Sequence, residues 1–79
     1  MARVLLFGPL RDLAGWGDRE IDSGSIAALR ASLAAEHAEL GAALEGPGVQ
    51  VALDQVIVRG DAALTAASEL AFLPPMSGG

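Results

Sequence analysis

The sequence contains no cysteine and no lysine. Without cysteine the chain can form no disulfide and offers no thiol for catalysis, so its 79 residues depend on an apolar core. A chain of this length makes one domain and buries only about two-thirds of the surface that its unfolded form exposes. Hydrophobic residues make up 52% of the chain and charged residues 19%, which argues against disorder.

Basic residues are scarce, and all five are arginines. Ten acidic residues oppose them, which gives a formal net charge of −5. An acidic surface repels phosphate backbones and anionic lipids, so we expect no nucleic acid and no membrane as a partner, but a basic protein surface. The absence of lysine has two interpretations. Lysine is excluded either because an internal amine could attack an activated C-terminus, or because of codon bias. We favour codon bias.

Long apolar runs are also missing. No stretch approaches the ~20 residues that cross a bilayer. The N-terminal apolar run from Val4 to Phe7 ends at Gly8-Pro9 and is too short for the core of a signal peptide. We therefore expect a cytoplasmic protein.

Apolar patterning predicts the order of the elements. Short apolar or alternating segments predict strands at residues 3–8, 18–22, 49–53, 56–58 and 70–73. Apolar steps of three and four residues predict a main helix at 26–37 with Ser25 as its N-cap, and helical turns at 10–14 and about 39–45. Asp54-Gln55 is the expected turn between two strands.

This order predicts an α+β domain of the ubiquitin-like β-grasp class, with a mixed sheet of about five strands packed on one main helix. The first and last strands are the most apolar, so we place them side by side at the centre of the sheet. Residues 1–73 would form the domain. Residues 74–79 would form a flexible, extended C-terminal tail.

The tail consists of Pro74, Pro75, Met76, Ser77, Gly78 and Gly79. The two prolines donate no backbone hydrogen bonds, so the sheet must stop there. Six extended residues reach about 20 Å. Glycine has no Cβ, so a Gly-Gly end can pass through a narrow channel. Residues 74–78 would thread into such a channel and carry the terminal carboxylate of Gly79 with them. A carboxylate activated as an acyl-adenylate can react with a sulfur nucleophile and become a thiocarboxylate, which is a sulfur donor.

Both ends of the chain resemble one family, the small sulfur-carrier subunits of molybdopterin synthase. VLLFGPLRDLAG (4–15) resembles that family's first strand and helical turn, and LTAASELAFLPPMSGG (64–79) resembles its last strand and tail. The sequence departs from the family at Asp54-Gln55, where Asn-Gly is common, and at 66–68, where Asp-Gly-Asp is common.

The resemblance implies a reaction and its partners. Gly79 would be adenylated with ATP by a ubiquitin-activating-type adenylyltransferase and then converted to the thiocarboxylate. Within a heterotetramer with the large synthase subunit, it would donate sulfur to cyclic pyranopterin monophosphate and form the dithiolene of molybdopterin. The chain would hold no permanent cofactor and would be no enzyme by itself, because the catalytic groups are expected on the large subunit.

Strand alternation predicts a docking surface for these partners. If Val4, Leu6, Leu53, Leu70 and Phe72 pack on the helix, then Phe7, Ile57 and Leu73 face outward. The alternative is that the faces are reversed and these three belong to the core. The resemblance favours docking, because matching positions in the family contact both partners.

Other polar residues give weaker signals. Arg11 either pairs with an acidic group on a partner or is solvated. The single histidine, His37, lies near the end of the helix and has no second ligand at metal-binding spacing, so we expect a structural role and no metal site.

Two other functions remain open. One is a sulfur carrier for thiamine thiazole, cysteine or tRNA thiolation, although Pro74-Pro75 favours the molybdopterin pathway. The other is a β-grasp binding module or protein modifier that carries no sulfur.

Overall fold

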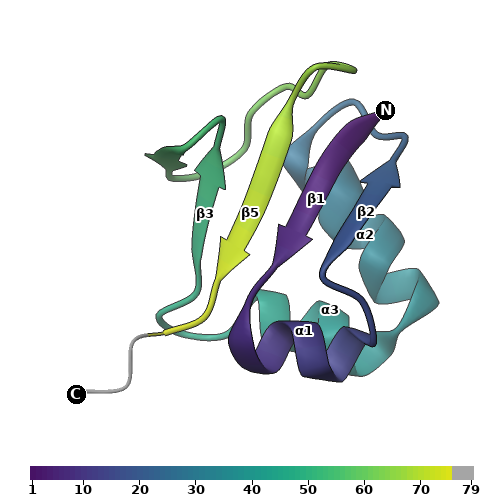
Figure 1. Cartoon of the computed structure of the whole chain (residues 1–79), viewed down its shortest axis with the longest axis vertical. Helices are drawn as coiled ribbons and strands as arrows, with labels where there is room; N and C mark the ends of the chain where they lie inside the picture. Colours follow the sequence, from purple (N-terminus) through teal and green to yellow (C-terminus); the bar gives the residue numbers. More distant parts are fainter. Residues whose placement is uncertain (76–79) are drawn as a thin grey trace.

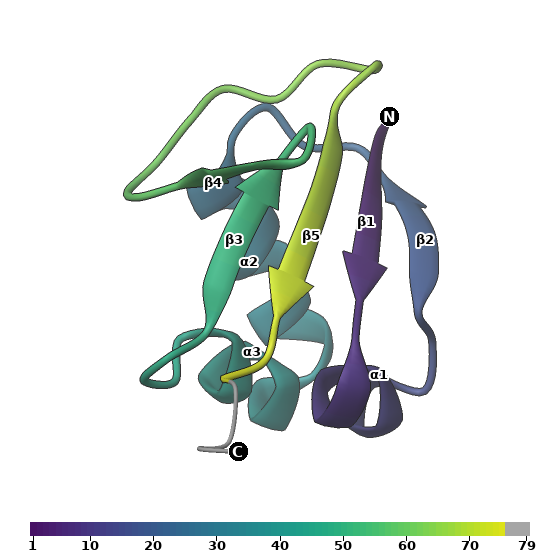
Figure 2. The same ribbon diagram turned by 60° about the vertical axis from the view of Figure 1, so that its left-hand side comes forward.

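Five strands form one mixed sheet, with α2 and α3 against one face and α1 at one end (Figures 1 and 2). The computed structural model describes residues 1–75. In chain order the elements are β1 (Ala2–Leu6), α1 (Gly8–Ala14), β2 (Asp18–Ile21), α2 (Ile26–Glu36), α3 (Ala38–Leu44), β3 (Gln50–Leu53), β4 (Val56–Val58) and β5 (Glu69–Leu73). Within this part of the chain, no helix has the length and apolar character needed to cross a membrane.

The strands lie in the order β2-β1-β5-β3-β4. The central strands β1 and β5 run parallel, and every other neighbouring pair is antiparallel. Val4, Leu6, Leu70 and Phe72 point from these two strands into the core and are almost fully buried. The predicted β-grasp arrangement, with the first and last strands adjacent at the centre, is therefore confirmed.

The helix layer contains the predicted main helix, and short helices lie where the two helical turns were predicted. The main helix α2 begins as expected, because the Ser25 hydroxyl accepts a hydrogen bond from the Ala28 amide at 3.1 Å. The two predicted turns, α1 and α3, are helices of seven residues each. Gly8 has a φ of +54° and Pro9 occupies the first turn of α1, so the first strand ends at Leu6 instead of residue 8.

Gly41 explains why α3 is a packed helix. A Cβ at Gly41 would lie 2.4 Å from the Ala34 Cβ, so glycine is what lets α3 approach α2 this closely. His37 joins the two helices, and its Nδ1 accepts a hydrogen bond from the Leu40 amide at 3.2 Å. His37 therefore has a structural role, and it is the N-cap of α3, which was not predicted from the sequence.

Candidate functional site

The C-terminal tail leaves the sheet from its middle. β5 pairs with β1 on one side and with β3 on the other, and its last residue, Leu73, lies opposite Gln50. The buried residues Leu70 and Phe72 hold β5 against the helices. The point from which the tail departs is therefore fixed by the best-buried part of the fold.

Two glycines with positive φ border the two prolines that begin the tail. A Cβ at Gly8 would lie 3.3 Å from the Pro74 Cγ, and a Cβ at Gly48, whose φ is +83°, would lie 2.7 Å from the Pro75 Cβ. Each glycine supplies both the backbone conformation and the space that the adjacent proline occupies. The sequence-based prediction missed this role of Gly8 and Gly48, although Gly8-Pro9 and Pro47-Gly48 are recognisable turn signals.

The predicted reactive residue, Gly79, and the predicted threading residues Met76, Ser77 and Gly78 lie outside the described residues. Of the predicted threading residues, the structure places Pro74, which is partly buried, and Pro75, which is exposed. The boundary between a domain at 1–73 and a tail at 74–79 stays a prediction.

The open face of the sheet carries an apolar row. Paired residues on neighbouring strands project from the same side of a sheet, so the register places four side chains in line. These are Leu5 on β1, Ala71 on β5, Ala52 on β3 and Ile57 on β4. We call this row, together with Phe7 and Leu73 beside it, the outer apolar surface.

The predicted orientation of the strands is confirmed. Phe7 is 44% exposed and Ile57 is 47% exposed, while Leu73 is partly buried. Their predicted opposites Val4, Leu6, Leu70 and Phe72 are buried, and Leu53 packs against the core. Docking by Phe7, Ile57 and Leu73 remains a prediction, but the faces are not reversed.

Charged residues border the outer apolar surface on its β2 side, where Asp18 lies opposite Leu5, and at the start of β1 and β5, where Arg3 lies opposite Glu69. Arg3 donates a hydrogen bond from Nε to Asp18 Oδ1 at 3.0 Å, and its Nη1 lies 3.9 Å from the Glu69 carboxylate. The hydrogen bond from Arg3 lowers the pKa of Asp18 below its ordinary value, and the same bond raises the pKa of Arg3. The apolar row therefore meets charge at its β2 end, beside Leu5, and runs from there across β5 and β3 to Ile57 on β4.

Arg11 lies on α1, beside the loop that leads into β2. It is an exposed residue of α1, and with Asp12 and Trp16 it lines a small hollow. A Cβ at Gly17 would lie 2.7 Å from the Arg11 Nε, so the arginine side chain lies along the Gly17 backbone. A role for Arg11 with a partner stays a prediction.

The described residues offer no group that would hold a metal ion. No cluster of three or more His, Cys, Asp and Glu side chains occurs among residues 1–75. The arrangement in this part of the chain is that of a presenting domain, with a buried central strand that leads into the tail and an apolar surface beside the exit.

Comparisons with known proteins agree with this geometry. The ThiS family matches residues 4–79 of the chain. The molybdopterin synthase sulfur carrier subunit of Escherichia coli (strain K12) is 37% identical over 81 residues, which covers 100% of this chain and 100% of that protein.

Two solved structures share the fold. The solution structure of small archaeal modifier protein 1 (SAMP1) from Methanosarcina acetivorans aligns with a TM-score of 0.85 and 21% identity, covering 99% of this chain and 95% of that one. The crystal structure of SAMP1 from Haloferax volcanii aligns with a TM-score of 0.79 and 24% identity, covering 99% and 98%. At these identities the likeness establishes the β-grasp fold and nothing further.

Proposed function

The chain belongs to the ThiS family of sulfur carriers, and on that premise we propose that it is the sulfur-carrier subunit of a molybdopterin synthase. The observation that carries the proposal is the 37% identity to the Escherichia coli subunit of that function over the full length of both chains. The resemblance of the Pro-Pro-Met-Ser-Gly-Gly end to the tails of such carriers supports it.

The proposed chemistry takes place at Gly79. Its carboxylate attacks the α-phosphorus of ATP on an adenylyltransferase, and pyrophosphate leaves. A sulfur nucleophile then displaces AMP, so that one carboxylate oxygen is replaced by sulfur. The thiocarboxylate transfers this sulfur to cyclic pyranopterin monophosphate, and water restores the carboxylate. The dithiolene contains two sulfur atoms, so each product molecule consumes two loaded carriers.

The described residues have a supporting part in this reaction. The outer apolar surface lies beside the tail exit, so a partner seated on it would receive the tail directly. Phe7 and Ile57 expose apolar side chains, and a partner can cover them without rearranging the buried core. We infer that this surface docks on the large subunit, on the adenylyltransferase, or on each in turn, in the cytoplasm where ATP is available.

Mass spectrometry tests the loading step. The chain is co-expressed with the adenylyltransferase of a molybdenum-cofactor pathway and a sulfur donor, and its intact mass is measured. We expect a mass increase that corresponds to one oxygen replaced by one sulfur, located in the C-terminal peptide. A chain that lacks Gly79 is the matched control and should show no increase.

The loading experiment, followed by an assay of sulfur delivery to each acceptor, separates the alternatives. An unchanged mass in the full chain, with the Escherichia coli subunit loaded in parallel, would contradict the proposal and favour a β-grasp binding module. A loaded chain that delivers sulfur only to a thiazole or a tRNA would assign it to another pathway.

A further inference from the structure

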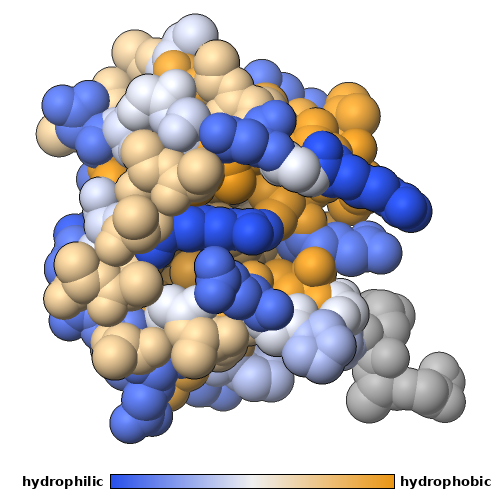
Figure 3. Space-filling view, turned by 180° about the vertical axis from the view of Figure 1, so that it is seen from behind, coloured by the Kyte–Doolittle hydropathy of each residue, from blue (hydrophilic) through white to orange (hydrophobic). Residues whose placement is uncertain are grey.

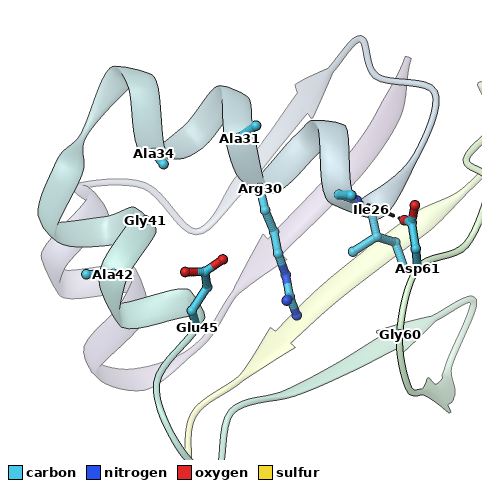
Figure 4. Close-up of a pocket in the computed structure, with 10 residues that line it drawn as sticks. Ile26, Arg30, Ala31, Ala34, Gly41, Ala42, Glu45, Gly60 and Asp61 are labelled. Carbon is cyan, nitrogen blue, oxygen red and sulfur yellow. Dashed lines mark hydrogen bonds between the residues drawn. The ribbon is translucent and has the colours of Figure 1, made fainter.

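Two hollows that share Arg30 and Gly60 in their walls lie between the helices and the β4 edge of the sheet. The first, of about 600 Å³, opens between α2, the end of α3 and the segment that follows β4. The second, of about 270 Å³, continues from Arg30 to β3 and β4. In Figure 4, Arg30 extends from α2 between Glu45 and Asp61 toward the sheet. Figure 3 shows this side of the molecule, where apolar surface lies deep between strongly hydrophilic side chains.

Arg30 is a partly buried cation without a carboxylate partner among residues 1–75. Its Cζ lies 5.8 Å from the centroid of the buried Phe72 ring, and its Nε is buried with no hydrogen-bond acceptor in the described part of the chain. Burial of a charged group costs free energy unless an opposite charge compensates it. An anion on the terminal nitrogens of Arg30 would supply that compensation.

The second hollow is locally basic in an acidic protein. Among the described residues that line it, Arg30 and Arg59 are the only charged ones, and Val49, Val51 and Val58 give it apolar walls. The acids Glu45 and Asp61 line only the first hollow. Asp61 Oδ1 already accepts hydrogen bonds from the amides of Ala27 and Ala62, each at 2.9 Å. A carboxylate from outside would therefore meet its opposite charge in the second hollow.

β4 borders this hollow and has a free edge. Within residues 1–75 it pairs with β3 alone, and its three residues Val56, Ile57 and Val58 carry no charge. The opposite edge, β2, carries the charged run Asp18-Arg19-Glu20, which is a common protection against strand addition. β4 lacks this protection, and an extended peptide can add to such an edge.

We propose that β4 and the hollow between Arg30 and Arg59 bind an extended acidic segment of a partner protein, in which glutamates alternate with aliphatic residues. In a strand added to β4, alternate side chains face opposite sides of the sheet. The glutamates on the inner side pair with the two arginines, and their methylene groups pack on the valine walls. The aliphatic side chains on the outer side extend the row that ends at Ile57. The site uses the β4 edge and two arginines, none of which belongs to the tail, so peptide binding can be measured without sulfur transfer.

NMR spectroscopy of the ¹⁵N-labelled full chain tests the proposal. The probe is a capped octapeptide of alternating valine and glutamate. We expect saturable shifts of the amide signals of Ile57 and Val58 and of the Arg30 Nε–H signal. Arg30→Gln or Arg59→Gln removes a charged hydrogen-bond donor and should raise the Kd about tenfold. Arg59 is exposed, so Arg59→Gln keeps the test valid if Arg30→Gln fails to fold.

Three controls decide the outcome. Arg19→Gln makes the same charge change on β2 and should leave the Kd unchanged. An octapeptide with lysine in place of glutamate should not bind, and proline at a central valine should abolish binding because it blocks strand pairing. No saturable shift with the glutamate peptide, equal binding of the lysine peptide, a normal Kd in Arg59→Gln, or shifts confined to Phe7 and Leu73 would each overturn the proposal.

Discussion

Single glycines determine how the tail leaves the fold. Gly48 has a φ of +83°, and a Cβ there would lie 2.7 Å from the Pro75 Cβ. Gly15 has the same φ of +83°, but a Cβ there would meet nothing within 4 Å. The two positions therefore share the conformational cost of a side chain and differ in the contact with the tail.

We predict that Gly48→Ala and Gly15→Ala each lower the free energy of unfolding by about 1–2 kcal/mol, the cost of the left-handed conformation for an L-residue. Only Gly48→Ala should also slow thiocarboxylate formation, because its Cβ displaces Pro75. Chemical denaturation and intact-mass kinetics measure the two effects. Equal loading rates in the two variants would show that the Gly48 contact does not position the tail.

The turn between β3 and β4 is strained at a position where glycine is usual. Asp54 and Gln55 both have positive φ, 49° and 71°. These values match the hairpin turn that Asn-Gly favours, so the departure from the family at this site changes the residues and keeps the backbone. Asp54 is held in place because its Oδ1 accepts a hydrogen bond from the Glu69 amide at 2.9 Å.

Gln55→Gly should therefore stabilise the protein. Glycine removes a conformational cost of about 1–2 kcal/mol but adds about 0.5–1 kcal/mol of chain entropy in the unfolded state, so we expect a net gain of up to about 1.5 kcal/mol. Thermal or urea denaturation measures it. A loss of stability would mean that the Gln55 side chain makes a contribution larger than the backbone strain.

At the scale of elements, the sheet separates a core face from the outer apolar surface. Phe7→Asp and Ile57→Asp should weaken binding to the large subunit of molybdopterin synthase at least about tenfold, because a buried carboxylate without a partner is costly in an interface. Both side chains are nearly half exposed, so the isolated domain should still fold. Calorimetric titration and circular dichroism measure binding and folding.

Val56→Asp is the matched control for this surface. Val56 is 64% exposed in the same hairpin, but its partner Leu53 packs against the core, so its side chain projects from the other side of the sheet. Its substitution should leave the affinity unchanged. Equal weakening by all three substitutions would mean that charge on the hairpin, and not the outer apolar surface, determines binding.

Two exposed ion pairs join β2 to its neighbours. Arg3 pairs with Asp18, and Arg19 on β2 pairs with Glu36 on α2 at 2.8 Å. The hydrogen bonds from these arginines lower the pKa of Asp18 and of Glu36 in the folded state. A lowered folded pKa stabilises the fold at pH values above the unfolded pKa, and this stability is lost as the pH falls through the folded pKa.

We predict that Asp18→Asn and Glu36→Gln reduce stability slightly at pH 7, since the pairs are exposed. The difference from the unsubstituted protein should shrink as the pH falls below the ordinary pKa of the two carboxylates and disappear once the pH has passed their lowered folded-state pKa. Urea denaturation at a series of pH values measures it. A difference that persists unchanged at low pH would point to packing instead of charge.

Much of this arrangement was predictable from local sequence patterns. Alternation in β1 and β5 predicted which side chains are buried, because a strand with one covered face repeats every two residues. The hydroxyl of Ser25 predicted the start of α2. In contrast, Gly41 predicted a weak helix, but it is the residue that lets α3 contact α2. That contact joins separate elements and leaves no periodic signal in the sequence.

At the candidate site, too, contacts between residues far apart in the sequence were not predictable. The exposure of Phe7 and Ile57 followed from strand parity. The roles of Gly8 and Gly48 did not, because each depends on a proline that is distant in sequence. The hollow at Arg30 was missed for the same reason, since its walls come from α2, β3 and β4.

At the scale of the whole molecule, the first and last strands lie together, and β5 ends at Leu73 within the outer apolar surface. The buried hydrophobic residues of the described part run from Ala2 to Phe72. The predicted reactive residue, Gly79, lies beyond all of them in the sequence. The fold and the proposed chemistry should therefore be separable by changes at the C-terminus.

Sulfur transfer in a single turnover tests this separation most directly. The thiocarboxylated chain is mixed with the large subunit of molybdopterin synthase and cyclic pyranopterin monophosphate, and the dithiolene product is measured. We predict that the full chain delivers its sulfur and returns to the carboxylate, while a chain without Gly79, carried through the same loading step, yields no product and has an unchanged melting temperature. Dithiolene formation with the truncated chain, or none with a fully loaded intact chain, would contradict the account.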